Sequence, residues 1–129
     1  MKTILLDTNA ISALFNGDTQ VLDFLAKAER VCISTVVMGE LQAGFYMGSK
    51  VRENQTHLEK LLSRPTVEIL PVTAETSDYY GRLVAALRKE GHPIPVNDIW
   101  IAAQTLEQGA ILISYDKHFA NVPGLRVKP

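Results

Sequence analysis

The chain has 129 residues, the size of one ordinary domain, and we expect residues 1–129 to fold as a single domain. Its 47% hydrophobic and 21% charged residues exclude an intrinsically disordered chain. Thirteen Lys and Arg against fourteen Asp and Glu give a net charge of -1, which excludes a protein-wide basic field for nucleic acid or anionic membranes.

The first half of the chain predicts two buried strands, each followed by a pair of helices. Short continuous apolar runs are typical of strands buried on both faces, and apolar residues at helical spacing follow each run. Either Ser34 or Thr35 is a suitable N-cap for the third helix. We expect strands at residues 4–6 and 31–33, and helices at about 10–15, 21–28, 35–47 and 51–62.

The second half predicts three more strands and two helices. Pro71 places the third strand of the chain near a sheet edge, because proline cannot donate to a strand ladder. Continuous apolar strands that alternate with helices predict an α/β fold, with a parallel sheet of four or five strands flanked by helices. We expect strands at 67–72, 110–113 and, as the fifth, 125–127, and helices from the cap Thr73 to Gly91 and from Asn97 or Asp98 to Glu107.

Cysteine usage and hydropathy indicate a protein of the cytoplasm. Cys32 has no second cysteine to pair with, so we expect a small buried side chain in a reducing compartment. The apolar run 4–6 ends at Asp7, too early for a secretory segment, and no stretch approaches the length of a membrane span. We therefore expect a cytoplasmic protein with no membrane association.

Four of the fourteen acids are difficult to place on a solvated helix face or in a turn. Asp7 and Asp116 each follow an apolar strand, at the carboxyl edge where open parallel sheets bind ligands. Glu40 shares a mostly apolar helix face, where an unpaired acid is costly, and Asp98 opens a helix that is apolar almost all round. These four acids are the candidate site residues.

Each of these acids also has a simpler explanation. Asp7 is suited to an Asx-turn and Asp116 to a surface turn, while Asp98 complements the dipole of its helix as a first-turn acid. A buried ion pair with an arginine of the long helix would explain Glu40. The candidates for that ion pair are Arg82 and Arg88.

Taken together, the four acids favour a metal site. Four carboxylates that meet at one crevice repel one another unless a cation lies between them, and oxygen ligands suit Mg²⁺ or Mn²⁺ rather than Zn²⁺. The sequence has no Cys/His spacing typical of zinc sites. Such a pocket fits the hydrolysis of a phosphate ester by a metal-activated water.

Four segments of the sequence contain these acids. They are Ile4-Leu5-Leu6-Asp7-Thr8-Asn9 with Ser12, Gly39-Glu40-Leu41 with Gly44, Pro95-Val96-Asn97-Asp98-Ile99-Trp100-Ile101-Ala102-Ala103, and Leu112-Ile113-Ser114-Tyr115-Asp116. In this order and spacing they resemble the successive motifs of the PIN domain, specifically of the VapC-type toxin ribonucleases. The resemblance covers essentially the whole chain, with a mild departure at Tyr115, where the family often has a polar residue such as Asn.

The resemblance implies a parallel sheet flanked by helices and an enzyme that cleaves RNA endonucleolytically. It implies Mg²⁺ or Mn²⁺ as the cofactor, with Asp7, Glu40, Asp98 and Asp116 as the acids that hold the metal and carry catalysis. It also implies a homodimer and inhibition by a small antitoxin protein.

Other polar residues are candidates for supporting roles. Thr8 and Ser114 are suited to orient a ligating carboxylate, and Asn9 to fix the strand-to-helix turn, with local capping as the alternative. His118 is expected to be a turn histidine, and assistance to a leaving group is the alternative. Two groups of basic residues are candidates for a local patch that meets RNA phosphates, with a solvated face as the alternative for each. One group is Arg82, Arg88 and Lys89 on the long helix, and the other is Lys50 and Arg52 at the start of an earlier helix.

Competing functions need residues that this sequence lacks. A receiver-like Mg²⁺-binding signalling domain needs an adjacent acidic pair after the first strand, and Asp7-Thr8 is not such a pair. A phosphatase of the haloacid dehalogenase type needs a second acid where Asn9 stands. The presence of all four acids argues against an inactive PIN-like binding scaffold. A PIN-domain nuclease of RNA processing outside a toxin–antitoxin system stays open as an alternative.

Overall fold

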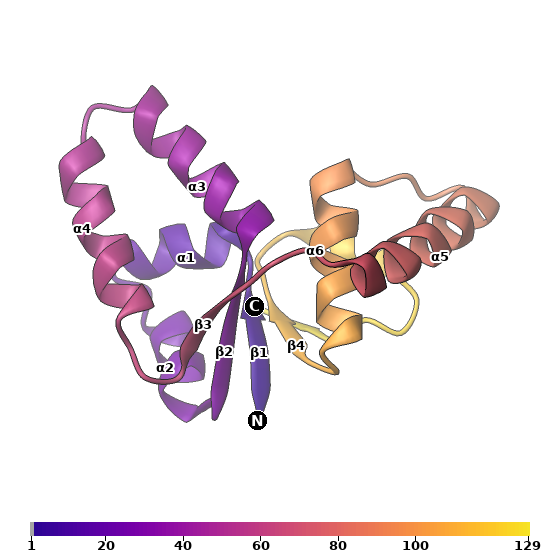
Figure 1. The fold of residues 1–129 in the computed structure, drawn as a ribbon, viewed down its shortest axis with the longest axis horizontal. Helices are drawn as coiled ribbons and strands as arrows, with labels where there is room; N and C mark the ends of the chain where they lie inside the picture. Colours follow the sequence, from indigo (N-terminus) through magenta and orange to yellow (C-terminus); the bar gives the residue numbers. More distant parts are fainter. Residues whose placement is uncertain (1) are drawn as a thin grey trace.

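Strands in the middle of the molecule separate two groups of helices (Figure 1). The structure is a computed structural model that describes residues 2–129. Within these residues the elements are β1 Thr3–Leu6, α1 Thr8–Phe15, α2 Thr19–Lys27, β2 Arg30–Ser34, α3 Thr35–Met47, α4 Val51–Leu62, β3 Val67–Leu70, α5 Ala74–Glu90, α6 Val96–Glu107, β4 Ile111–Ile113, the 3₁₀ helix η1 Lys117–Asn121, and β5 Val127–Lys128. Figure 1 shows α1 to α4 on one side of the strands, and α5 and α6 on the other.

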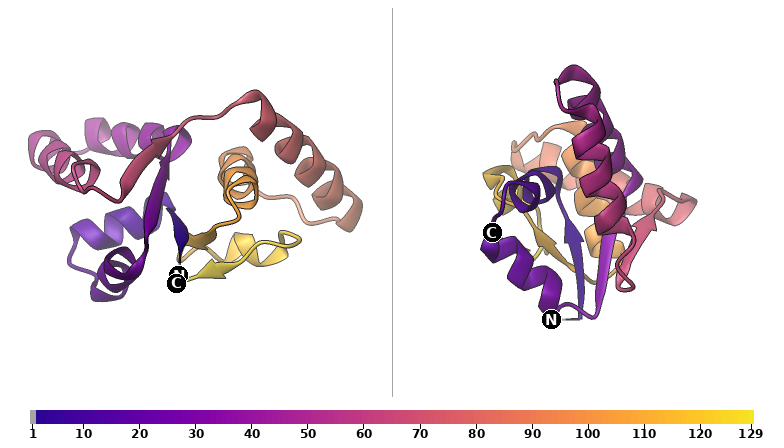
Figure 2. Two further views of the ribbon diagram at one scale, coloured as in Figure 1. Left: turned by 60° about the horizontal axis from the view of Figure 1, so that its bottom comes forward. Right: turned by 90° about the vertical axis from the view of Figure 1, so that its left-hand side faces the viewer.

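The five strands of the described chain form one parallel sheet in the order β3-β2-β1-β4-β5. This confirms the predicted α/β class and the edge position of β3. From β1 the chain adds β2 and β3 on one side, and Figure 2 shows the segment after β3 crossing the molecule to α5. The chain then places β4 and β5 on the other side of β1, so the carboxyl ends of β1 and β4 are neighbours at the point where the strand order reverses.

The apolar runs of the sequence lie where buried strands need them. Ile4, Leu5 and Leu6 of β1 are fully buried, and so are Leu112 and Ile113 of β4. These side chains have no contact with water on either face of the sheet, as the continuous apolar runs predicted. Of the helices formed by residues 2–129, none combines the length and apolar character that crossing a membrane requires.

Several element boundaries differ from the prediction, and β3 ends at Leu70, so that Pro71 lies just outside the strand. Helix α6 begins at Val96 and not at Asn97 or Asp98, because Pro95 occupies the N-cap with φ -55° and ψ 145°. Helix α1 begins at Thr8, since the Asp7 side chain caps it by accepting the Thr8 N–H. Strand β5 lies at 127–128 rather than 125–127, because the chain still turns at 124, a glycine with φ 74°.

A buried threonine joins α5 to α6. Thr76 is fully buried in the first turn of α5, where its Oγ1 accepts a hydrogen bond from the Thr73 N–H (3.1 Å) and donates one to Glu107 Oε1 (2.7 Å). Thr73 accepts the Thr76 N–H in return, which completes a capping box at the predicted cap. The N-terminus of the long helix is therefore tied to the last turn of α6.

We predict that Thr76→Val lowers the free energy of unfolding by about 1–3 kcal/mol, because valine leaves Glu107 and the Thr73 N–H without this partner. Urea denaturation followed by circular dichroism measures the change. Thr56→Val is the matched control, since Thr56 is exposed on α4, and we expect it to cost less than about 0.5 kcal/mol. Equal losses in the two variants would assign the effect to helix propensity and not to the contact between α5 and α6.

Candidate active site

Asp7 and Asp116 lie where the strand order reverses. Asp7 directly follows β1, and Asp116 follows the end of β4 by three residues. The hydrogen-bonded ladder continues past the strand end, since the Asp7 N–H donates to the Ile113 carbonyl (3.0 Å). The two acids therefore come from neighbouring strands at the carboxyl edge of the sheet.

Glu40 and Asp98 reach the same edge from two helices. Helix α3 begins directly after β2, with Ser34 as its N-cap, so Glu40 in the second turn lies close to the strand ends. Asp98 lies in the first turn of α6. Because α3 packs against α6, the two acids face a common space.

The four acids line one cavity of about 390 Å³, here called the acid cavity. Its walls come from the ends of β1 and β4 and from α1, α3 and α6. In the part of the chain that the structure describes, no Lys or Arg lines it, so its negative charge has no basic partner in the walls. The lining residues are Asp7, Thr8, Asn9, Ser12, Glu40, Asp98 and Asp116.

Asp7 is the most buried of the four acids, with 4% of its surface exposed. Its Oδ1 accepts the Thr8 N–H (2.8 Å), and its Oδ2 accepts the Ser114 hydroxyl (2.6 Å). The pKa of Asp7 is raised to about 6, because burial and the Asp98 and Glu40 carboxylates raise it by more than these hydrogen bonds lower it. The charged form of Asp7 is therefore unfavourable here unless a cation lies close to it.

Two hydroxyl groups hold the acids in place. The Thr8 hydroxyl donates to Glu40 Oε1 (2.8 Å). The Ser114 hydroxyl donates to Asp7 and accepts the Asp116 N–H (3.0 Å), so one buried serine contacts both acids at the strand ends. Both residues have the contacts that the sequence analysis expected of residues supporting a ligating carboxylate.

Asn9 acts on a different segment from the expected one. Its Oδ1 accepts the Tyr115 N–H (3.0 Å), so it holds the segment after β4 and not its own strand-to-helix turn. The Tyr115 hydroxyl donates to Asp18 Oδ2 at the N-cap of α2 (2.6 Å). Tyr115 is the residue that departs from the family pattern, and this contact holds its side chain outside the acid cavity.

His118 was expected to be a turn histidine, but its ring contacts two of the acids. Its Nδ1 lies 3.3 Å from Asp98 Oδ2 and 3.1 Å from Asp116 Oδ1. Burial raises the pKa of Asp98, the hydrogen bond with His118 lowers it, and the charges of Asp116 and Glu40 raise it. In the sequence His118 stands two residues after Asp116, which indicated its place near that acid but not its contact with Asp98.

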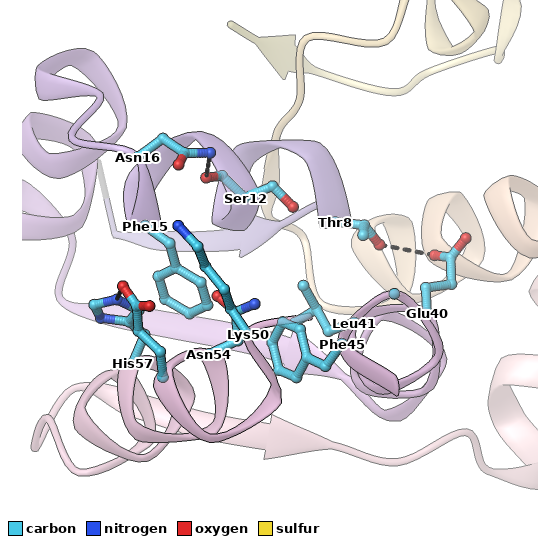
Figure 3. Close-up of a pocket in the computed structure, with 12 residues that line it drawn as sticks. Thr8, Ser12, Phe15, Asn16, Glu40, Leu41, Phe45, Lys50, Asn54 and His57 are labelled. Carbon is cyan, nitrogen blue, oxygen red and sulfur yellow. Dashed lines mark hydrogen bonds and ion pairs between the residues drawn. The ribbon is translucent and has the colours of Figure 1, made fainter. Parts of the chain in front are cut away.

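A second cavity of about 410 Å³, here called the side cavity, adjoins the acid cavity. The two share Thr8, Ser12 and Glu40. Figure 3 shows Thr8 and Glu40 at one end of the side cavity and His57, whose ring stacks on Phe15, at the other. The remaining lining residues are Asn16, Leu41, Gly44, Phe45, Lys50, Glu53 and Asn54.

The five predicted basic residues are not gathered around the acid cavity. Among the five, only Lys50 lines either cavity within residues 2–129, and it lines the side cavity. Arg82 pairs with Asp78 on the exposed surface of α5 (3.0 Å), and the residues described show no ion pair of Glu40 with an arginine. Of the other predicted basic residues, Arg52 is exposed on α4, and Arg82, Arg88 and Lys89 are exposed on α5.

Comparison with known proteins finds matches over nearly the whole chain. Ribonuclease VapC2 of Rickettsia felis is 35% identical over 126 residues, which cover 94% of this chain and 92% of that protein. The model of the PIN domain family matches residues 4–125. The chain belongs to the PIN domain family. The family identification drawn from the four sequence motifs is therefore confirmed.

Solved structures share this PIN domain fold. The structure of VapBC2 from Rickettsia felis bound to a DNA fragment from their promoter contains a similar chain, with a TM-score of 0.87, 28% identity, and coverage of 98% of this chain and 97% of that chain. VapBC-5 from Mycobacterium tuberculosis, a member of the VapBC family of toxin–antitoxin systems, has a TM-score of 0.71, 28% identity, and coverage of 98% and 95%.

We predict that Asp98→Asn raises the melting temperature of the metal-free protein at neutral pH. Folding raises the pKa values of Asp7 and Asp98, so their charges destabilise the fold at high pH. That loss is relieved as pH falls through the folded pKa values, about 6 for Asp7. Removing one charge should add a few degrees at about pH 7.5 in EDTA, and less near about pH 5.

Thermal melts of both proteins at the two pH values measure this difference. Asp78→Asn is the control, because Asp78 is an exposed acid in a surface ion pair, and its melting temperature should stay close to that of the wild type. Asp98→Asn should also gain less from added Mn²⁺. An Asp98→Asn protein that melts no higher than wild type in EDTA would contradict the repulsion argument.

Proposed function

We propose that this chain is a Mg²⁺- or Mn²⁺-dependent endoribonuclease that acts as the toxin of a toxin–antitoxin pair. The observation that carries the proposal is the meeting of four carboxylates around one cavity at the carboxyl edge of the sheet. Ribonuclease VapC2, which aligns with 94% of this chain, supports the same activity. The enzyme is thus a hydrolase that cleaves RNA phosphodiester bonds.

The acid cavity fits a divalent cation. Its carboxylate oxygens are the hard ligands that Mg²⁺ and Mn²⁺ prefer. No Lys or Arg among the described residues lines the cavity, and burial of Asp7 without a balancing charge raises its pKa. When bound, the cation supplies a Lewis acid that stabilises charge on phosphoryl oxygens and lowers the pKa of water. The residues that would hold it are Asp7, Glu40, Asp98 and Asp116.

Thr8 and Ser114 act as positioning residues in this proposal. Each hydroxyl donates to one oxygen of an acid, Thr8 to Glu40 and Ser114 to Asp7. These bonds fix the direction of the carboxylates before substrate arrives, which limits the reorganisation that the reaction requires. Asn9 acts on Asp116 indirectly, because it accepts the N–H of the preceding residue, Tyr115.

The side cavity extends the acid cavity toward a basic residue. Lys50 lies in its lining, where an ammonium group balances the charge of a phosphate next to the one being cleaved. Basic residues on α4 and α5 would meet phosphates farther along the RNA. They are Arg52, Arg82, Arg88 and Lys89.

Two alternative functions are less well supported. A receiver-like signalling domain needs a second acid beside Asp7, but Thr8 stands there and its hydroxyl donates to Glu40. It also needs a lysine at the acids, and no lysine of residues 2–129 lines the acid cavity. A PIN-domain nuclease of RNA processing is disfavoured because relatives that cover nearly the whole chain are named Ribonuclease VapC.

The proposed function includes a protein partner and a second copy of the chain. The solved relatives are VapBC complexes, one of them described as a toxin–antitoxin system, which supports a small antitoxin as partner. For the homodimer, the supporting feature is the end of α3, where Tyr46 and Met47 are 70% and 84% exposed. We place the pair in the cytoplasm, as the lone cysteine indicates.

We predict that the purified protein cleaves RNA with Mg²⁺ or Mn²⁺ and not in EDTA. Asp7→Asn should lower the cleavage rate about a hundredfold or more, since several kcal/mol of transition-state stabilisation depend on the metal. Gel analysis of structured RNAs measures the rates. Asp23→Asn, an exposed acid paired with Lys27 on α2, should cleave like wild type. Cleavage that persists in EDTA or in Asp7→Asn would rule out the proposed chemistry.

We predict that light scattering reports about twice 14.3 kDa for the isolated chain. Met47→Lys should weaken the dimer about tenfold or more, because it places a charge in the apolar surface at the end of α3. Leu22→Lys is the matched control, since Leu22 is 46% exposed on α2 and lies outside that surface. A monomer at tens of micromolar, or equal weakening by both variants, would contradict this interface.

A further inference from the structure

One residue beside the acids has no role in the proposed function. The His118 Nδ1 lies within 3.3 Å of oxygen atoms of both Asp98 and Asp116, although its side chain is 55% exposed. Its other ring nitrogen has no hydrogen bond among residues 2–129. A histidine whose contacts are confined to two proposed metal ligands is itself a candidate ligand.

The fold fixes the backbone from which this ring projects. Asp116 caps η1 by accepting the His118 N–H at 2.9 Å, so the backbone of the histidine is tied to the acid. The next residue, Phe119, is 1% exposed and anchors the short helix in the core. From this fixed backbone the ring of His118 reaches the carboxylates of both Asp98 and Asp116.

The spacing of the three groups suits one cation. One ligand-capable atom from each of Asp98, Asp116 and His118 lies within 4.8 Å of the other two. Adjacent ligands in an octahedral site with bonds of about 2.1 Å are about 3 Å apart. The distances of 3.1 and 3.3 Å from Nδ1 to the carboxylate oxygens match that separation, so only small side-chain shifts are needed.

We propose that the Nδ1 atom of His118 is a ligand of the divalent cation, together with Asp98 and Asp116, and that it makes the site select Mn²⁺ over Mg²⁺. The proposal rests on the metal site of the proposed function. Imidazole nitrogen suits Mn²⁺ and later transition metals, whereas Mg²⁺ keeps to oxygen ligands and water. A site of four carboxylates alone holds both ions through oxygen, and the added nitrogen favours Mn²⁺.

The competing explanation is that the neutral or charged ring only donates its Nδ1–H to the two carboxylates. In that arrangement His118 affects the metal through the acids alone, and its loss changes Mg²⁺ and Mn²⁺ binding alike. A direct nitrogen ligand gives two results that this arrangement does not. They are magnetic coupling between bound Mn²⁺ and a ¹⁴N nucleus, and a change in the ratio of the two affinities.

The experiment uses the full chain with Mn²⁺ as the probe. Pulsed electron paramagnetic resonance of bound Mn²⁺ detects ¹⁴N coupling, and calorimetry with Mg²⁺ competition gives both affinities. The variant is His118→Asn, which keeps a polar group near the acids. His92→Asn is the control, because His92 is exposed in the loop between α5 and α6. Melting temperatures within a few degrees of wild type show that each variant is folded.

We expect ¹⁴N coupling in wild type and in His92→Asn, and none in His118→Asn. The Mn²⁺ affinity of His118→Asn should fall about tenfold while its Mg²⁺ affinity changes less than about threefold. Mn²⁺ that binds wild type without ¹⁴N coupling, coupling that persists in His118→Asn, or equal loss of both affinities would overturn the proposal and leave the four-acid site intact. Absence of Mn²⁺ binding to wild type would overturn both.

Discussion

The parallel pairing of β1 with β4 is the interaction on which the site depends. It aligns Leu6 with Ile113, and the ladder runs one step farther through the Asp7 N–H and the Ile113 carbonyl. That register places the Ser114 hydroxyl 2.6 Å from Asp7, and the same oxygen accepts the Asp116 N–H. A shift by one residue would turn Ser114 to the opposite face, because successive side chains of a strand alternate. Asp7 and Asp116, which are more than a hundred residues apart in the sequence, are thus fixed in position relative to one another.

Packing of apolar side chains keeps together acids that repel one another. Asp7 and Asp98 both have raised pKa values, with burial as the first cause and neighbouring carboxylates adding to it. The fold tolerates these charges because Leu6, Ile113 and Ile101, all fully buried, fix β1, β4 and α6 beneath them. The acids are therefore held together at the expense of stability, and the proposed cation would reverse part of that loss. Folding of the protein would then be linked to binding of that cation.

The sequence predicts the parts of the site that depend on local pattern. Apolar runs locate β1 and β4, and an acid after each run places Asp7 and Asp116 at the strand ends. The sequence does not contain the strand order, and contacts that depend on it were missed. The Tyr115 hydroxyl meets Asp18 at the N-cap of α2, and the His118 ring of η1 meets Asp98 of α6. Such contacts join residues 20 to 97 positions apart, beyond any helical or strand periodicity.

The structure also shows that an acid that caps a helix can still line the proposed metal site. A carboxylate has two oxygens and about four acceptor positions, so one hydrogen bond to a helix N-terminus leaves the rest free. Asp7 caps α1 and Asp116 caps η1, yet both line the acid cavity. Asp98 differs, because the N-cap of α6 is Pro95, the helix has no side-chain cap, and the Asp98 carboxylate contacts His118 instead. A first-turn position still complements the helix dipole. From sequence, a local role was the simplest explanation for Asp98. Within residues 2–129, however, the one hydrogen bond of its side chain is to His118, twenty residues away.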